Sequence, residues 1–394
     1  MPSFALNSCR VALALVALGL VSGGARSQVM IIGNDEKVGW TKEGAPVQGE
    51  PGHDTLSIVD MAKPDQLRMV ATIPLANSIV GPPTNLAVVP GGAIALVANA
   101  VNAVPKDKGY QLVADDKVFV IDLQANPPKL IGTVTVGKKP SGMAIAPNGT
   151  FALVANRDDG SISVLSIAGK DVKVSDTVSI GTGADQVSAV AITPDGKLAL
   201  ATKSAANKIA LLSLDGGKAT YAKRDLPTGI FPYNVVVTPD GKLALSVDNG
   251  NGGSSDGNVD TVSVIDLEAD PVRVGDHLTV GDSPEGLAVS PRGDLAVAIE
   301  ARGSNQPKTS WFYHPGGAVT VLTIAGKKVA RAGEVTVGAL PEGAVFSPDG
   351  SHLYVGNFID KDLSVLAITG DKLSDTGQRF KLPGHPASLR GGPQ

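Results

Sequence analysis

Two short segments of the chain each hold a glutamate between a proline and a glycine, and these glutamates are the groups best suited to chemistry. The segments are Pro284-Glu285-Gly286 and Pro341-Glu342-Gly343. Two carboxylates brought to one place repel each other unless a cation, a proton or an amide separates them. Either glutamate could serve as a general base that activates water, or as a ligand of a metal ion that polarises a carbonyl group. A second interpretation leaves both side chains facing water or capping neighbouring loop amides.

Three further polar residues would join this site if the fold brings them to the same place. Asn85 and Asn234 would add hard oxygen ligands of the kind that Ca²⁺ prefers, and His385 could act as an acid or base at the rim. The chain contains no HExxH spacing, no GxSxG elbow, no P-loop and no Rossmann fingerprint. The sequence is thus compatible with Ca²⁺ bound by Glu285, Glu342, Asn85 and Asn234, and it requires no cofactor.

A repeat of Pro-x-Gly turns indicates which elements position these residues. Six such turns occur at intervals of 45 to 57 residues, beginning at Pro90, Pro147, Pro194, Pro239, Pro291 and Pro348. Alternating apolar stretches rich in Val, Ile and Thr surround every turn, which predicts β-strands. Each repeat holds four strands, named a to d in chain order, with the Pro-x-Gly turn between strands a and b. An aromatic content of only 4% and 47 glycines also favour short strands over a helix bundle.

The two ends of the chain complete each other as a seventh repeat. Residues 29–34, 54–60 and 68–75 supply strands b, c and d without a strand a, whereas residues 384–389 supply a strand a with nothing after it. Joining them closes a ring of four-stranded blades, which a linear solenoid would not require. The sequence therefore predicts an all-β fold, a single seven-bladed β-propeller over residues 28–390, followed by a tail at 391–394.

One face of this propeller is expected to carry the binding residues. Strand a would line the central channel, and the b–c and d–a connections would share one face. Long loops on a rigid scaffold concentrate binding residues, and four b–c connections are long: 34–53, 99–117, 249–260 and 300–317. Aromatic side chains gather there, although they could also simply pack the loops onto the body. The expected ligand-binding face comprises Trp40, His53, Asn85, Tyr110, Asp185, Tyr233, Asn234, Trp311, Phe312, Tyr313 and His314.

Several strand ends resemble the YVTN repeat, a β-propeller family. Val97-Ala98-Asn99 and Val154-Ala155-Asn156 follow the Pro-x-Gly turns, and a c strand ends in Val264-Ile265-Asp266. The resemblance covers about residues 29–390 and implies the fold. It implies function only loosely, because the family includes surface-layer and periplasmic proteins and relatives of lactonase-type and quinoprotein propellers. Lys203 and Ala301 replace the strand-ending Asn in two repeats, so these Asn residues are predicted to brace turns. The polar channel mouth is similar to the axial metal site of calcium-dependent lactonases.

The first 27 residues are predicted to be a signal peptide that is cleaved near Ser27. A single Arg10 precedes an apolar run at 11–21, too short to span a bilayer, and small residues follow it. The only cysteine, Cys9, would be removed with this peptide, which excludes disulfides and a covalently attached c-type haem from the mature chain. We therefore expect a periplasmic or secreted protein without a membrane span. Its net charge of −4 makes nucleic acid an unsuitable partner.

Three functions are compatible with these features. We expect a monomeric, non-catalytic binding or scaffold protein whose long-loop face holds a small molecule or a periplasmic protein. The alternative is a lactonase-type hydrolase in which Glu285, Glu342 or His385 acts at the channel mouth. A third interpretation, implied only by the relatives of the fold, is an accessory to a periplasmic quinoprotein or haem oxidation system.

Overall fold

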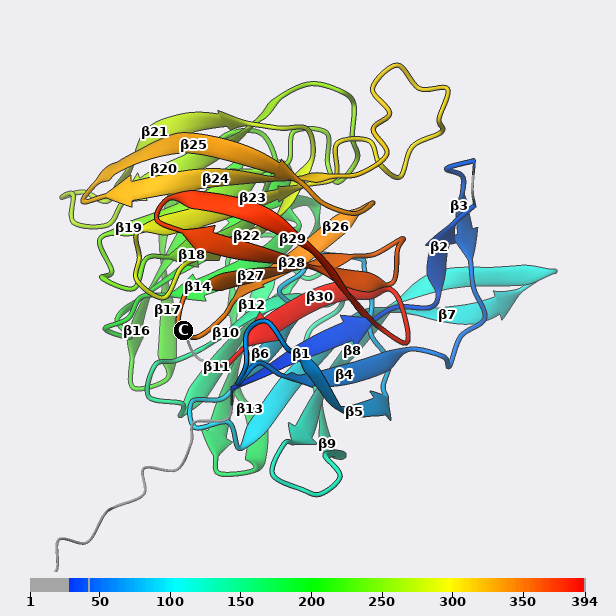
Figure 1. Ribbon diagram of the computed structural model, residues 1–394. Coiled ribbons are helices and arrows are strands. Elements are labelled where there is room, and N and C mark those ends of the chain that lie inside the picture. The colour runs from blue at the N-terminus through cyan, green and yellow to red at the C-terminus, as the bar shows by residue number, and fades with distance from the viewer. Residues whose placement is uncertain (1–27, 42, 393–394) are drawn as a thin grey trace, which may run out of the picture.

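The chain folds into a ring of seven four-stranded antiparallel sheets (Figure 1), which confirms the predicted seven-bladed β-propeller. The computed structural model describes residues 28–41 and 43–392. The predicted signal peptide, residues 1–27, lies outside the described residues. Within the described part of the chain, no helix has the length and apolar character needed to cross a membrane.

The blades are numbered in chain order, beginning with the blade that closes the ring, and their strands are given from the centre outward. The closing blade consists of β30 (Pro386–Gly391), β1 (Val29–Asn34), β4 (Thr55–Asp60) and β5 (Arg68–Pro74). The second blade consists of β6 (Leu86–Val88), β7 (Ile94–Lys106), β8 (Gly109–Asp122) and β9 (Lys129–Thr135). The third blade consists of β10 (Pro140–Ile145), β11 (Phe151–Asn156), β12 (Ser161–Ala168) and β13 (Asp171–Ser179).

The remaining blades repeat this order. The fourth consists of β14 (Val187–Ile192), β15 (Leu198–Lys203), β16 (Lys208–Asp215) and β17 (Lys218–Pro227). The fifth consists of β18 (Pro232–Val237), β19 (Leu243–Asp248), β20 (Asp260–Asp266) and β21 (Arg273–Val280). The sixth consists of β22 (Pro284–Val289), β23 (Leu295–Glu300), β24 (Ala318–Ala325) and β25 (Lys328–Thr336). The seventh consists of β26 (Pro341–Phe346), β27 (His352–Asn357), β28 (Asp362–Thr369) and β29 (Lys372–Lys381).

The Pro-x-Gly turns have the geometry that their residues dictate. In each of them the glycine N–H donates to the carbonyl oxygen three residues earlier, as from Gly149 to Ala146 at 2.8 Å. The six glycines have φ between 69° and 72°, the left-handed region that a residue with a Cβ rarely adopts: Gly92, Gly149, Gly196, Gly241, Gly293 and Gly350. Uniform tight turns on one face leave the opposite face to carry the long connections.

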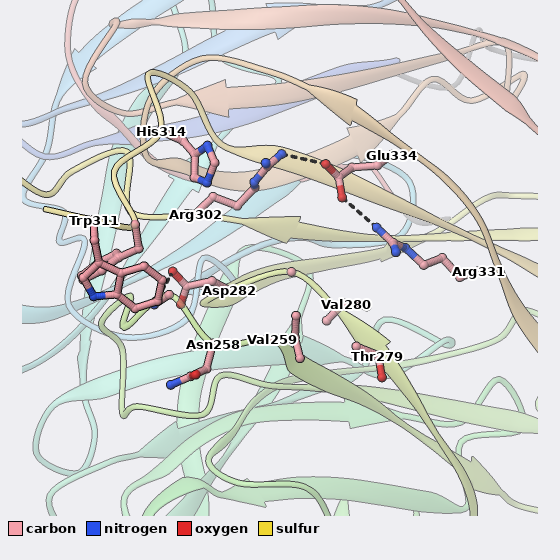
Figure 2. A pocket seen from close by; sticks show the side chains of 13 residues that line it. Asn258, Val259, Thr279, Val280, Asp282, Arg302, Trp311, His314, Arg331 and Glu334 are labelled. Atoms are coloured by element: carbon pink, nitrogen blue, oxygen red, sulfur yellow. Dashed lines mark hydrogen bonds and ion pairs between the residues drawn. The ribbon is translucent and has the colours of Figure 1, made fainter. Parts of the chain in front are cut away.

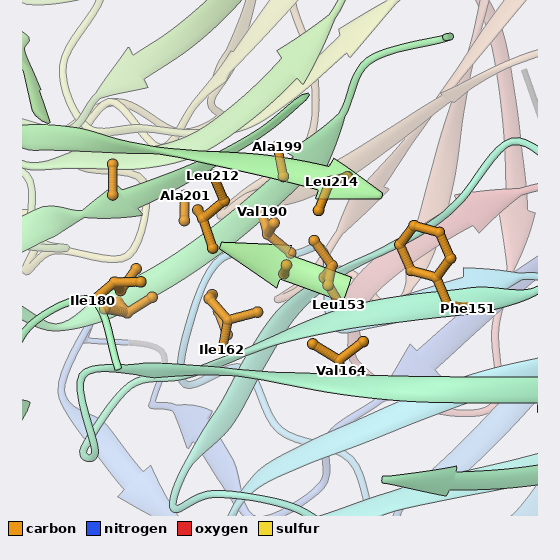
Figure 3. Packing of buried hydrophobic residues seen from close by; sticks show 14 of the residues in the cluster. Phe151, Leu153, Ile162, Val164, Ile180, Val190, Ala199, Ala201, Leu212 and Leu214 are labelled. Atoms are coloured by element: carbon orange, nitrogen blue, oxygen red, sulfur yellow. The ribbon is translucent and has the colours of Figure 1, made fainter. Parts of the chain in front are cut away.

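The core lies between blades rather than inside one central mass. Both faces of a middle strand are covered by neighbouring blades, so all six residues of β11 are buried, whereas the outermost strand β13 is mostly exposed. Figure 3 shows Leu153 and Ile162 of the third blade packed toward Val190 and Leu212 of the fourth. Burying each such side chain contributes roughly 1.5–3 kcal/mol. Small aliphatic residues suffice for these thin layers, which accounts for the low aromatic content.

In several blades the asparagine that ends strand b braces the connection to strand c, as predicted. Asn156 Nδ2 donates to the Oγ atoms of Ser161 and Ser163 at 3.0 and 2.9 Å, and Asn357 makes the equivalent bonds in the seventh blade. The prediction was wrong about one residue of this set. Pro284 pairs with Glu300 as Pro140 pairs with Asn156, so Glu300 and not Ala301 occupies the position in the sixth blade.

Two of the long b–c connections are more ordered than a loop. The connection 34–53 contains a hairpin of β2 (Val38–Trp40) and β3 (Pro46–Gln48). The connection 99–117 was expected to be a loop, but β7 and β8 remain paired through it to a two-residue tip between Lys106 and Gly109. Apolar residues that favour strands continue beyond the blade, among them Val101, Val104 and Val113. Figure 1 shows both hairpins on the same side of the ring.

A buried cluster of charged groups lies beside the joint between the two ends of the chain. Buried Lys37 Nζ lies 2.5 Å from Asp54 Oδ2 and 3.2 Å from Asp35, and it also donates to the Asn77 carbonyl oxygen. Asp35 N–H donates to the His385 carbonyl oxygen at 2.9 Å. The segment that follows β1 is therefore fixed to the segment that precedes β30.

We expect Lys37→Met to lower the free energy of unfolding by about 3–5 kcal/mol, because it leaves buried carboxyl groups without their cation. Lys361→Ala is the matched control, since its ion pair with Glu36 is partly exposed and should contribute at most about 1 kcal/mol. Urea unfolding at pH 7 measures both. Equal effects of the two substitutions would contradict the role given to Lys37.

Candidate active site at the channel mouth

Glu285 and Glu342 lie at the starts of β22 and β26, the innermost strands of neighbouring blades. Both side chains are buried, with 8% and 1% of their surface exposed. The glycine after each glutamate allows this packing. A Cβ on Gly286 would lie 2.2 Å from the Glu342 carbonyl oxygen, and one on Gly343 would lie 2.9 Å from the backbone nitrogen of Leu389. The Pro-Glu-Gly motif therefore places two carboxyl groups where neighbouring backbones almost touch.

Burial and mutual repulsion change the acidity of this pair. Desolvation raises the pKa of Glu285 to about 7, and the nearby positive charge of Arg157 partly opposes the increase. Desolvation and then the negative charge of Glu285 raise the pKa of Glu342 well above its usual value. Desolvation and repulsion therefore favour a state in which Glu285 ionises before Glu342.

Arg157 is a residue of the candidate site that the sequence analysis did not identify. It directly follows the brace Asn156, and its guanidinium donates to Gln186 Oε1 at 2.7 and 3.2 Å. The same guanidinium carbon lies 5.7 Å from the ring centre of Tyr233, on the fifth blade. Burial raises the pKa of the Tyr233 hydroxyl above its usual range, so this group stays protonated. The only signal in the sequence was that Arg157 directly follows the asparagine that ends a strand b.

The four residues proposed as calcium ligands are not all brought together. Asn234 is 1% exposed and its amide has no partner, but Asn85 lies three blades away and donates to Asn77 Oδ1 and the Ala98 carbonyl oxygen, both at 2.7 Å. Over residues 28–41 and 43–392, no three His, Asp or Glu side chains gather as metal ligands. Ca²⁺ needs six to eight oxygens, and the third charged group beside the glutamate pair is a guanidinium. This donor set fits a proton and Arg157 rather than Ca²⁺.

An aromatic cluster lies beside the ring closure. Trp40 meets Phe358 edge-on at 5.5 Å, and Phe358 stacks on His385 at 4.8 Å. His385 Nδ1 lies 2.8 Å from the Phe358 carbonyl oxygen, which assigns the proton to Nδ1, and its Nε2 lies 3.9 Å from Glu36. His385 is thus held as part of this aromatic cluster and of the ring closure. Phe358 was not recognised from the sequence.

The other residues expected on this face lie away from the glutamate pair. His53 is exposed beside Glu50, and Asp185 pairs with Lys203 and caps its own turn, η1 (Gly183–Asp185). Tyr110 lies near the tip of the β7–β8 hairpin, opposite Pro105. Trp311, Phe312 and His314 line a separate hollow, and Tyr313 belongs to the same loop.

Solved structures of similar fold cover almost the whole chain. A provisionally assigned 6-phosphogluconolactonase of Bacteroides fragilis is 17% identical with a TM-score of 0.68, covering 94% of this chain and 99% of that one. A periplasmic gluconolactonase of Pseudomonas aeruginosa is 18% identical with a TM-score of 0.65, covering 93% and 99%. A functionally unknown protein of Desulfotomaculum acetoxidans is 15% identical with a TM-score of 0.66, covering 93% and 99%. These similarities show the fold. No family model and no curated protein matches the chain, so the YVTN resemblance stays a prediction.

We expect Gly286→Ala to destabilise the protein by at least about 2 kcal/mol, because the added methyl would meet backbone that cannot move freely. Gly333→Ala, on an outer strand with open space around the new methyl, should change stability by no more than about 0.5 kcal/mol. Denaturant unfolding of the two variants tests whether the innermost strands are as tightly packed as described.

We expect the stability of Glu285→Gln relative to the wild type to be about 3 kcal/mol higher at pH 8 than at pH 5. The pKa of Glu285 is raised from 4.5 in the unfolded chain to about 7 in the folded protein. The carboxyl group therefore contributes stability that is fully present below pH 4.5 and is lost as the pH rises through 7. Glu268→Gln, at an exposed position, is the control. A stability difference that does not change with pH would show that the carboxyl group is not perturbed.

Proposed function

We propose that the channel mouth hydrolyses lactones. The observation that carries this proposal is the buried pair Glu285 and Glu342 at the starts of two neighbouring innermost strands, where burial raises the pKa of both carboxyl groups. One base and one acid at a single place are what the two proton transfers of ester hydrolysis require.

The glutamates take opposite roles in the proposed reaction. The Glu285 carboxylate removes a proton from water as the water oxygen bonds to the lactone carbonyl carbon. The tetrahedral intermediate then collapses, the bond from that carbon to the ring oxygen breaks, and Glu342 gives its proton to the leaving oxygen. The product is the open hydroxy acid, and one proton has passed from the water to Glu285 and another from Glu342 to the product. Transfer of a proton from Glu285 to Glu342 restores the pair.

Arg157 and Tyr233 supply the charge stabilisation. The carbonyl oxygen becomes negative in the intermediate, and fixed donors in a water-poor site stabilise such an oxyanion strongly. The guanidinium of Arg157 is held in place by Gln186, and the protonated Tyr233 hydroxyl is a second donor.

The comparisons support this proposal only at the level of architecture. One similar structure is described as a gluconolactonase and another as a provisionally assigned 6-phosphogluconolactonase, both below 20% identity. If the wild type bound lactones but did not open them, the remaining function would be that of a binding protein that uses the same site.

We expect the mature chain, residues 28–394, to open glucono-δ-lactone faster than buffer does, with a bell-shaped pH profile whose acidic limb lies near pH 7. Glu285→Gln and Glu342→Gln should each lower kcat by about 10²–10⁴-fold, and Arg157→Met should do the same through loss of oxyanion stabilisation. A pH-indicator assay of acid release measures this, with Glu268→Gln as the control that keeps full activity.

The assay should be run in EDTA and in excess calcium, and both should give the same rate. Full activity in the double variant Glu285→Gln/Glu342→Gln would overturn the proposal, and a requirement for calcium would overturn the assignment of the pair as a proton-sharing acid and base.

A further inference from the structure

A second site lies away from the channel mouth, between the outer strands of the fifth and sixth blades. It is a hollow of about 310 Å³ between the ends of β21 and β25 and the connection 300–317 (Figure 2). This volume is at the lower end of the range for small-molecule sites and is enough for one sugar ring. No part of the proposed hydrolytic reaction uses it.

The apolar side of the hollow is an indole ring that is exposed to solvent but supported by neighbouring residues. Trp311 is 79% exposed, an unusual position in a chain with two tryptophans, and Val259 next to the hollow is 70% exposed. Phe312 meets the indole edge-on at 5.3 Å. Gly257 approaches so closely that an added Cβ would lie 2.6 Å from both residues. The indole therefore offers a flat, supported surface to solvent.

The polar side is a fixed chain of charged groups. Glu334 accepts one hydrogen bond from Arg302 and one from Arg331, each at 2.7 Å, and Figure 2 shows this chain across the hollow from Trp311. Asp282 accepts the backbone N–H groups of Asp256 and Gly257 at 3.1 and 3.2 Å, which orders the loop under the indole. Because each guanidinium uses one donor for Glu334, further N–H groups stay available for a ligand.

The charges of the hollow cancel. Two guanidinium groups face two carboxyl groups, so neither a phosphate nor an ammonium ligand gains net attraction. A neutral ligand with many hydroxyl groups suits such a site, because each hydroxyl can donate to a carboxylate or accept from a guanidinium. One face of a pyranose ring carries only C–H groups, and that face packs well on an indole.

We propose that this hollow binds a neutral carbohydrate, one ring of which stacks on Trp311 while its hydroxyls bond to Arg302, Glu334 and Asn258. The hollow is open to solvent on one side, so a longer glycan can leave it at either end of the stacked ring. This makes the protein a glycan-binding propeller at its rim, whether or not the channel mouth turns over lactones.

The test uses residues 28–394 and three probes, maltotetraose, cellotetraose and chitotetraose, followed by isothermal titration calorimetry and tryptophan emission. We expect at least one probe to bind and to change the emission. Trp311→Ala should weaken that binding at least tenfold, and Glu334→Gln should weaken it less. Ile230→Ala is the control, because it removes another exposed apolar side chain of the fifth blade and should leave the affinity unchanged.

Trp311→Ala should fold normally because the side chain is mostly exposed, and an unchanged melting temperature would verify this. Failure of all three probes to bind, or equal binding by Trp311→Ala, would overturn the proposal. If instead Trp311→Ala converted a dimer into a monomer in sedimentation, the exposed indole would be a contact between copies and the proposal would also be overturned. Lactone turnover is measured separately, so its loss or presence does not decide this result.

Discussion

Crowding of the innermost strands around the axis is the constraint on which the rest of the molecule depends. At Gly286 and Gly343 the neighbouring backbone comes within 3 Å of where a Cβ would lie. Side chains that start this close to the axis cannot all be solvated. Glu285 and Glu342 are therefore buried side by side, and the cost of two charges in that space is reduced by a proton and by Arg157. The raised pKa values of this glutamate pair are a consequence of how tightly the innermost strands pack around the axis.

Ring closure itself depends on charge as well as on strand pairing. β30 pairs with β1 in an antiparallel register, and the segments beside them are joined where the Glu36 carboxylate accepts a hydrogen bond from the His385 N–H. His385 therefore contributes to the structure in two ways: its backbone N–H bonds to Glu36 at the ring closure, and its ring stacks on Phe358. Ring closure also brings Trp40 within 5.5 Å of Phe358, although the two residues are more than three hundred positions apart in the chain.

The sequence carried the architecture almost completely, because each blade repeats the same local rules. The predicted b strand at 29–34 is β1 residue for residue, and the matching a strand is displaced by only two residues. The predictions that were wrong concerned features that the repeat pattern alone does not determine. Ala301 was assigned in place of Glu300 because a one-residue shift cannot be resolved without the pairing of Pro284. The 99–117 connection was taken for a loop because its continued pairing extends beyond the blade.

The candidate site was predictable only in part for the same reason. The Pro-Glu-Gly motifs identified Glu285 and Glu342 from their equivalent places in two repeats. Arg157 could not be found this way, since its partners Gln186 and Tyr233 come from the two following blades and no local spacing links them. Asn85 was grouped with the glutamates by its position in the repeat, yet the ring places it three blades from Asn234 and ties it to Asn77.

The central claim is that this pair holds one proton near neutral pH, and carbon-13 NMR of the glutamate side-chain carboxyls tests it most directly. Spectra of the wild type and of the Glu285→Gln and Glu342→Gln variants, recorded from pH 4 to pH 9, assign the two signals. The account predicts that one carboxyl titrates near pH 7 and that the other is still protonated there. Two carboxyls that both lose their protons below pH 5 would contradict it.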